Sequence, residues 1–166
     1  MGFTMNDARF HISSPAFESG KAMPSKFAMK AVTGGKNISI PLVWENIPPG
    51  TKSFAVSIVD LHPIANKWVH WIIVDIPPPV TSLTEGASMS KTKPPKSREF
   101  INSFGEPGYG GPQPPKGSGV HKYEITVYAL NVDSVQADIH SSLEKFKKAL
   151  EGKVIGSASM IGLFER

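Results

Sequence analysis

The sequence predicts an all-β sandwich that occupies one domain, residues 1–166. Fifteen prolines and 15 glycines interrupt short apolar runs at fairly regular spacing, a pattern typical of short strands joined by turns. Several of these runs are rich in β-branched and aromatic residues, and only one segment has convincing helical spacing. A chain of 166 residues can bury a core without metals or disulfides, so the absence of cysteine is compatible with this fold.

The two strongest strand predictions lie in the middle of the chain. Residues 53–60 (SFAVSIVD) and 69–76 (VHWIIVDI) are nearly continuous in β-branched and aromatic residues. Runs of this kind are typical of strands that have no solvent-facing side. We therefore expect both strands to be buried on both faces.

Weaker strand predictions flank this central pair. Residues 10–14 and 26–30 are short candidates near the start of the chain. Residues 122–130 (KYEITVYAL) alternate polar and apolar side chains, which is the pattern of a strand, and residues 157–164 (SASMIGLF) end the chain in a similar way. These later strands would complete the core.

One helix is predicted, at residues 142–150. Apolar residues recur there at helical spacing, and Gly152 provides a stop signal. Ser141 and Glu144 have the spacing of a capping box, in which two side chains satisfy free backbone N–H groups at the helix start. We expect this short helix to cover one end or edge of the sheets.

Charge and composition narrow the classes of partner and compartment. The chain has 18 Lys and Arg against 14 Asp and Glu, a net charge of +4, but the basic residues are scattered and form no stripe with aromatics. Nucleic acid is therefore not an expected partner. There is no charged segment followed by an apolar signal core, no run long enough to span a membrane, and no cysteine, so we expect a soluble, cytoplasmic protein without disulfides.

The long segment between the central strands and residue 122 is a candidate binding loop. Residues 77–119 are rich in Pro, Gly, Ser and Lys, and loops of this length inside a domain are usually functional or disordered. Gly110, Gly111 and Pro112 form a rigid turn whose backbone N–H groups are suited to an anion. Taken alone, this turn is also explained as an ordinary connection.

Four polar residues on the predicted strands are candidates for the same site. His121 and Tyr123 are two residues apart and therefore point to one side of their strand. His70 lies among apolar residues and needs a hydrogen-bond partner or a ligand, and Asp60 is placed to provide one. Each residue taken singly is equally explained by structure: a satisfied core histidine for His70 and a solvated strand face for the other pair.

Three segments, taken together, are more specific than any single residue. The first segment is residues 37–44 (NISIPLVW), followed by 47–54 (IPPGTKSF). The second is residues 60–76, which contain an aspartate and a His-Trp strand that leads into Ile-Pro. The third is residues 108–117 (GYGGPQPPKG), followed by 121–123 (HKY). In order and content they resemble the motifs of the phosphatidylethanolamine-binding protein family, also called Raf kinase inhibitor-like proteins, and specifically of its bacterial and archaeal branch.

The resemblance implies a fold, a site and a role. The fold would be a sandwich of two antiparallel sheets with Greek-key connections and a short C-terminal helix. The role would be a regulatory module that binds phosphate-like anions or phosphoryl headgroups, or inhibits a partner kinase or serine protease, with no cofactor and with a homodimer as one arrangement. The implied pocket residues are Asp60, His70, Gly110, Pro112, His121 and Tyr123, with Trp68 and Tyr109 near the rim.

His62 departs from the family pattern, because it stands where the family has a second aspartate. We expect it to join the ligand site and make the pocket less negative. An imidazole with an ordinary pKa of about 6.5 would then favour anion binding at about pH 5.5 over about pH 8.

Two other functions remain open from the sequence. Asp60, His62, His70 and His121 could form a zinc site that activates water, although their spacing is not a recognised metal pattern. A stable β protein with a vestigial pocket is the second alternative. A serine hydrolase is not expected, because the spacing places no acid–base pair beside Ser118.

Overall fold

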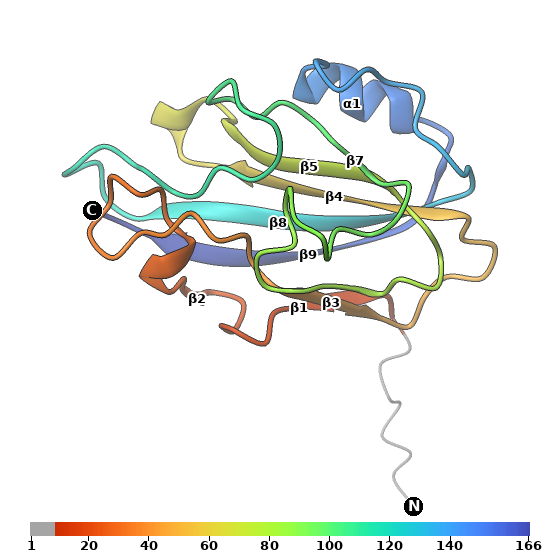
Figure 1. Cartoon of the computed structure of the whole chain (residues 1–166), viewed down its shortest axis with the longest axis horizontal. Helices are drawn as coiled ribbons and strands as arrows, with labels where there is room; N and C mark the ends of the chain where they lie inside the picture. The colour runs from red at the N-terminus through yellow and green to blue at the C-terminus, as the bar shows by residue number, and fades with distance from the viewer. Residues whose placement is uncertain (1–8) are drawn as a thin grey trace, which may run out of the picture.

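The computed structural model describes residues 9–166, and the predicted fold class is confirmed within them. Two layers of strands carry one α-helix on the outer side (Figure 1). The strands are β1 (His11–Ser13), β2 (Lys21–Ala22), β3 (Leu42–Glu45), β4 (Ser53–Asp60), β5 (Val69–Ile76), β6 (Ser82–Leu83), β7 (Arg98–Glu99), β8 (His121–Leu130) and β9 (Val154–Phe164). The helices are α1 (Leu143–Leu150) and the 3₁₀ turns η1 (Ser25–Phe27) and η2 (Pro63–Ala65).

The strands form a small and a large sheet. The small sheet has the order β1-β3-β6, and the large one has the order β2-β9-β8-β4-β5-β7. All pairs are antiparallel except β2 with β9 at the edge. Within the large sheet, β8 lies beside β4 while β5 and β7 follow on the other side, which is the strand order of a Greek key.

The central strands β4 and β5 have no exposed residue, as their sequences predict. Side chains alternate between two apolar clusters, since successive residues of a strand point to opposite faces. Phe54 and Trp71 belong to the cluster between the sheets, and Ala55 and Ile72 belong to the cluster on the outer face. Each strand therefore needs apolar residues on both sides, which explains the continuous runs in the sequence.

Helix α1 covers a face of the large sheet rather than an end or an edge. Its buried residues Phe146 and Leu150 pack in the outer cluster, on the side away from β1 and β3 (Figure 1). The predicted capping box is wrong by one residue: the N-cap is Ser142, whose Oγ accepts a hydrogen bond from the N–H of Lys145. The residue three positions after this cap is a lysine, which cannot complete a capping box.

Two further expectations differ from the structure. Residues 26–30 do not form a strand, because the chain turns into η1 after Pro24, which fixes its own backbone and cannot donate a hydrogen bond. The strands β2, β3, β6 and β7 were not predicted. Three of them have only two residues, too few for a period-two pattern to show in the sequence.

Candidate functional site

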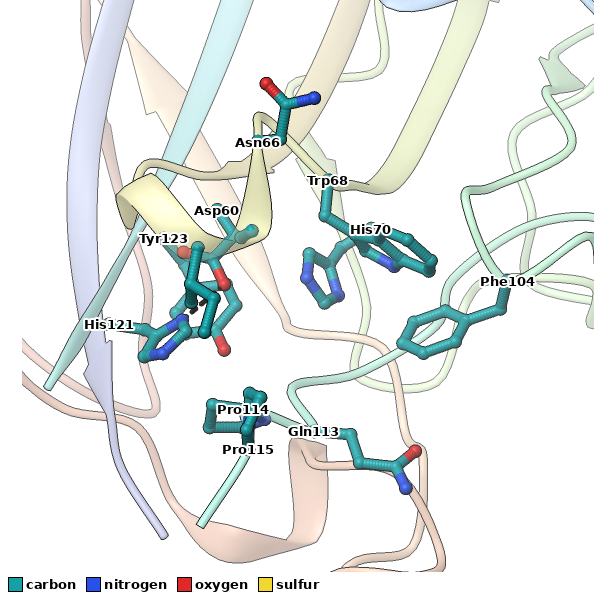
Figure 2. Close-up of a pocket in the computed structure, with 12 residues that line it drawn as sticks. Asp60, Asn66, Trp68, His70, Phe104, Gln113, Pro114, Pro115, His121 and Tyr123 are labelled. Carbon is teal, nitrogen blue, oxygen red and sulfur yellow. Dashed lines mark hydrogen bonds and ion pairs between the residues drawn. The ribbon is translucent and has the colours of Figure 1, made fainter. Parts of the chain in front are cut away.

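A cavity of about 630 Å³ opens where β4 ends and β5 and β8 begin. Figure 2 shows Asp60, His121 and Tyr123 on one side of it, with Trp68 and Phe104 on the other. All four strand residues that the sequence singled out line this cavity, as does Trp68. The complete lining is Asp60, Ile64, Ala65, Asn66, Trp68, His70, Phe104, Gln113, Pro114, Pro115, His121 and Tyr123.

Strand pairing brings Asp60 and Tyr123 together. Asp60 is the last residue of β4 and stands directly opposite Tyr123 of β8. Opposed residues of neighbouring strands point to the same face, and His121, two residues before Tyr123, shares that face. The expected common side of His121 and Tyr123 is thus observed.

His70 reaches the same cavity through a β-bulge. The pairing of β4 with β5 runs from Ile58 opposite Trp71 to Val59 opposite Val69, so His70 is the extra residue between them. A bulge bends its strand and redirects a side chain, and bulges are frequent beside functional sites. The strand sequence alone contains no sign of this shift in register.

The His70 ring is fixed in one tautomer by the glycine turn. Its Nδ1 lies 2.7 Å from the carbonyl oxygen of Gly110, which can only accept, so Nδ1 carries the proton. Burial of the ring, which is 3% exposed, lowers the pKa of His70 from 6.5 to about 4. Near neutral pH, Nε2 is therefore an unprotonated hydrogen-bond acceptor.

Asp60 and His121 form a buried, hydrogen-bonded pair in the wall of the cavity. The Nδ1 of His121 donates to Oδ2 of Asp60 over 2.6 Å, and Oδ1 accepts the backbone N–H of His62 over 2.9 Å. Both residues are at most 3% exposed. The carboxylate therefore orients His121, and not His70 as the sequence analysis proposed.

Ser118 extends this pair into a Ser–His–Asp chain that spacing did not predict. Its Oγ lies 2.8 Å from Nε2 of His121 and donates its only proton to the carbonyl of Pro115, 2.6 Å away. With its proton directed at Pro115, Ser118 is not aligned to transfer that proton to Nε2 of His121 in this arrangement.

Tyr123 presents an unsatisfied hydroxyl. The side chain is 1% exposed, and its oxygen forms no hydrogen bond of standard geometry among residues 9–166. Burial, the charge of Asp60 and a looser polar contact with the Asp60 carboxylate raise the pKa of Tyr123, so the hydroxyl keeps its proton. A buried donor without an acceptor is unfavourable, which makes this hydroxyl a contact point for a ligand.

His62 lies beside the site but does not line the cavity. Its ring stacks on His121 with centroids 3.9 Å apart, and its Nδ1 accepts the N–H of Ile64 at the start of η2. A protonated His62 would lose that hydrogen bond and place a charge against His121. The structure therefore gives His62 a role in shaping the η2 turn, rather than the anion contact expected from the sequence.

Tyr109, Gly110 and Pro112 also lie outside the lining. Tyr109 is in the core, where its hydroxyl donates to the carbonyl of Phe27. The turn N–H groups are already used: Gly110 donates to the backbone oxygen of His70, and Gly111 donates to Oδ1 of Asn37. The turn supports His70 from behind and does not form an anion cradle.

Gly111 shows why this turn requires glycine. A Cβ on Gly111 would lie 2.0 Å from the carbonyl oxygen of Phe27, closer than any side chain tolerates. The absence of side chains thus lets the turn pack between residues 27–28 and β5.

The zinc alternative does not match the contacts. In the described part of the chain, no three His, Cys, Asp or Glu side chains are placed to hold a metal ion. His121 uses both nitrogens, and His62 and His70 each use Nδ1 in the hydrogen bonds described above.

Several cavity residues were not singled out from the sequence. Gln113, Pro114 and Pro115 belong to the GPQPPKG run that carried the resemblance, so they could have been included. Asn66 and Phe104 had no such signal. Asn66 adopts a left-handed conformation (φ 48°) at the end of η2, and Phe104 packs edge-on against Trp68 at 5.3 Å.

Comparison with known proteins supports the sequence resemblance. A family model described as phosphatidylethanolamine-binding protein matches residues 13–165. A UPF0098 protein of Aquifex aeolicus is 34% identical over 167 residues, covering 99% of this chain and 93% of that protein. A UPF0098 protein of Methanothermobacter thermautotrophicus is 36% identical over 156 residues, covering 94% of this chain and 99% of that protein.

The fold is also similar to a solved structure. The crystal structure of Escherichia coli YbcL, described as a new member of the mammalian PEBP family, superimposes with a TM-score of 0.88 and 31% identity. The match covers 95% of this chain and 99% of that chain. As for membranes, no helix within residues 9–166 has the length and apolar character needed for a transmembrane span.

Proposed function

This chain belongs to the phosphatidylethanolamine-binding protein family, and from that premise we propose that its cavity binds the phosphoryl group of a small ligand or of a modified partner. The observation that carries the proposal is the buried hydroxyl of Tyr123, a residue of the cavity wall, because this donor forms no hydrogen bond of standard geometry within the protein. A phosphoryl oxygen is a strong acceptor that would satisfy it.

The cavity has the size and lining of a small-molecule site. Its volume of about 630 Å³ lies within the range of ligand pockets, roughly 300–1,000 Å³. Trp68 and Phe104 provide an apolar wall for the part of the ligand that carries the phosphoryl group. The side-chain amides of Asn66 and Gln113 add adaptable donors at the border.

Regulation, rather than catalysis, is the role we propose for this site. The ligand would be a free phosphorylated molecule or a phosphorylated protein, or the surface would inhibit a kinase or serine protease by occupying its active site. The Ser–His–Asp chain is the one feature that favours a hydrolase instead. In that chain Ser118 donates its proton to the Pro115 carbonyl and does not direct it at His121, as a nucleophile and its general base would require.

An NMR titration tests the proposed binding. Imidazole resonances would be followed during titration with inorganic phosphate and with phosphoethanolamine, using chloride at equal ionic strength as the control. We expect the His70 signals to shift and saturate, because this ring lines the cavity. The exposed His140 would serve as the internal reference.

Failure would also be clear in the same titration. If His70 does not respond to either anion, the cavity does not bind phosphoryl groups and the proposal is wrong. A parallel titration with zinc separates the metal alternative, because a response to zinc alone would favour it.

A further inference from the structure

We infer that the cavity selects phosphate monoesters in their singly protonated form, because it places one hydrogen-bond acceptor beside one donor and offers no lysine or arginine. The inference rests on the proposed function and specifies which state of the ligand is bound. It follows from three features of the wall: the acceptor, the donor and the balance of charge.

The acceptor is Nε2 of His70. Gly110 fixes the proton on Nδ1, which leaves a lone pair on Nε2 of the neutral ring. Burial keeps the ring neutral, since the pKa of His70 is lowered to about 4. An anion with only bare oxygens would therefore meet a lone pair at this position, whereas a P–OH group would donate to it.

The donor is the hydroxyl of Tyr123. The rings of His70 and Tyr123 meet edge to face with centroids 5.0 Å apart, and both residues line the cavity, so we expect one phosphoryl group to contact both. A singly protonated monoester has one P–OH for Nε2 and charged oxygens for the tyrosine. The dianion lacks the P–OH, and so does a phosphodiester.

The charges around His70 do not favour a dianion. Asp60 on β4, the one carboxylate of the lining, is hydrogen-bonded to His121 on β8, and the His62 ring stacks on His121. Tyr123 remains protonated, and Phe104 packs edge-on against His70. Free backbone N–H groups in a glycine turn could also attract an anion. Here, however, Gly110 donates to the backbone oxygen of His70 and Gly111 donates to Oδ1 of Asn37.

Three probes at two pH values test this inference by calorimetry. The second ionisation of a phosphate monoester lies near pH 6, so methyl phosphate carries a P–OH at about pH 5 and has lost it at about pH 8. Dimethyl phosphate is a monoanion without P–OH at both values. Inorganic phosphate keeps a P–OH at both, so it controls for titration of the protein and for the charge of the ligand.

We expect methyl phosphate to bind at least about tenfold more weakly at the higher pH, with a smaller change for inorganic phosphate and weak binding of dimethyl phosphate throughout. Two outcomes would overturn the inference while leaving phosphoryl binding intact. One is equal affinity for methyl phosphate at both pH values. The other is that dimethyl phosphate and methyl phosphate bind with equal affinity at low pH. Binding of none of the probes at either pH would refute the proposed function itself.

A pair of isosteric variants identifies the donor. Tyr123→Phe removes a hydroxyl that forms no hydrogen bond of standard geometry in the protein and keeps the buried ring, so folding should be preserved. Tyr128→Phe on the same strand is the matched control, because Tyr128 packs against Phe146 on the other face of the sheet. At low pH we expect about tenfold weaker methyl phosphate binding for Tyr123→Phe only; equal binding by the two variants would contradict the assigned donor.

Discussion

At the scale of single residues, His70 shows how burial and one hydrogen bond define a chemical role. The sequence identified this histidine as a residue that needs a partner, and the partner is the Gly110 carbonyl, 40 positions away. The hydrogen bond selects the tautomer, and desolvation keeps the ring uncharged. Near neutral pH, Nε2 of His70 is therefore a hydrogen-bond acceptor.

The buried His70 should also make the stability of the protein depend on pH. Its folded pKa of about 4 lies below the unfolded value of 6.5, so the unfolded state takes up the proton first as pH falls. The stabilisation is fully present above about pH 6.5 and is lost between that value and about pH 4, for a total of about 3 kcal/mol. Urea unfolding at a series of pH values measures this slope.

A comparison of variants isolates the contribution of His70. His70→Asn keeps a side-chain donor near the Gly110 carbonyl but does not titrate, so its stability should fall less steeply with decreasing pH. The exposed His140→Asn should retain the slope of the parent protein. An unchanged slope in His70→Asn would show that the ring is not held neutral by burial.

At the scale of elements, short-range signals predicted the type of each element better than its ends. The apolar spacing of residues 142–150 correctly predicted α1, but the cap is Ser142 and not Ser141. Either serine can accept a hydrogen bond from the N–H three residues ahead, so the choice depends on which backbone leaves the helical conformation. That is decided by how α1 packs on the sheet.

The cap assignment gives a paired prediction. Ser142→Ala removes the acceptor for the Lys145 N–H and should lower the free energy of unfolding by about 1 kcal/mol, or the melting temperature by about 2–4 °C. Ser141→Ala should change the free energy by less than about 0.5 kcal/mol, because its side chain does not cap the helix. Thermal unfolding of both variants checks this, and a larger loss in Ser141→Ala would restore the capping box predicted from the sequence.

At the scale of the whole molecule, the site is assembled from segments that are far apart in the sequence. Asp60 ends β4, His70 is in β5, Ser118 lies in the loop before β8, and His121 begins β8. The resulting Ser–His–Asp chain resembles that of a hydrolase in its distances, but Ser118 donates its proton to the Pro115 carbonyl and not to the histidine. Whether the protein is a binding module or a hydrolase depends on this difference.

A fluorophosphonate probe distinguishes the two functions. We expect no labelling of Ser118 at neutral pH, because its hydroxyl donates to the Pro115 carbonyl and not to His121. Intact mass spectrometry of the parent protein would measure this, and Ser118→Ala would be the control for labelling elsewhere. Stoichiometric labelling that Ser118→Ala abolishes would establish an activated nucleophile and overturn the binding-module proposal.

The sequence by itself determined the fold class, the central strands, the helix and the family, and it named Asp60, His70, His121 and Tyr123 as one group. These predictions depend on the local spacing of apolar residues and on the order of short motifs along the sequence. Only the tertiary structure decided that Asp60 orients His121, that a bulge turns His70 into the cavity, and that Tyr109 and the glycine turn stand behind it. Register and hydrogen-bond partners arise between residues distant in sequence, so no local pattern contains them.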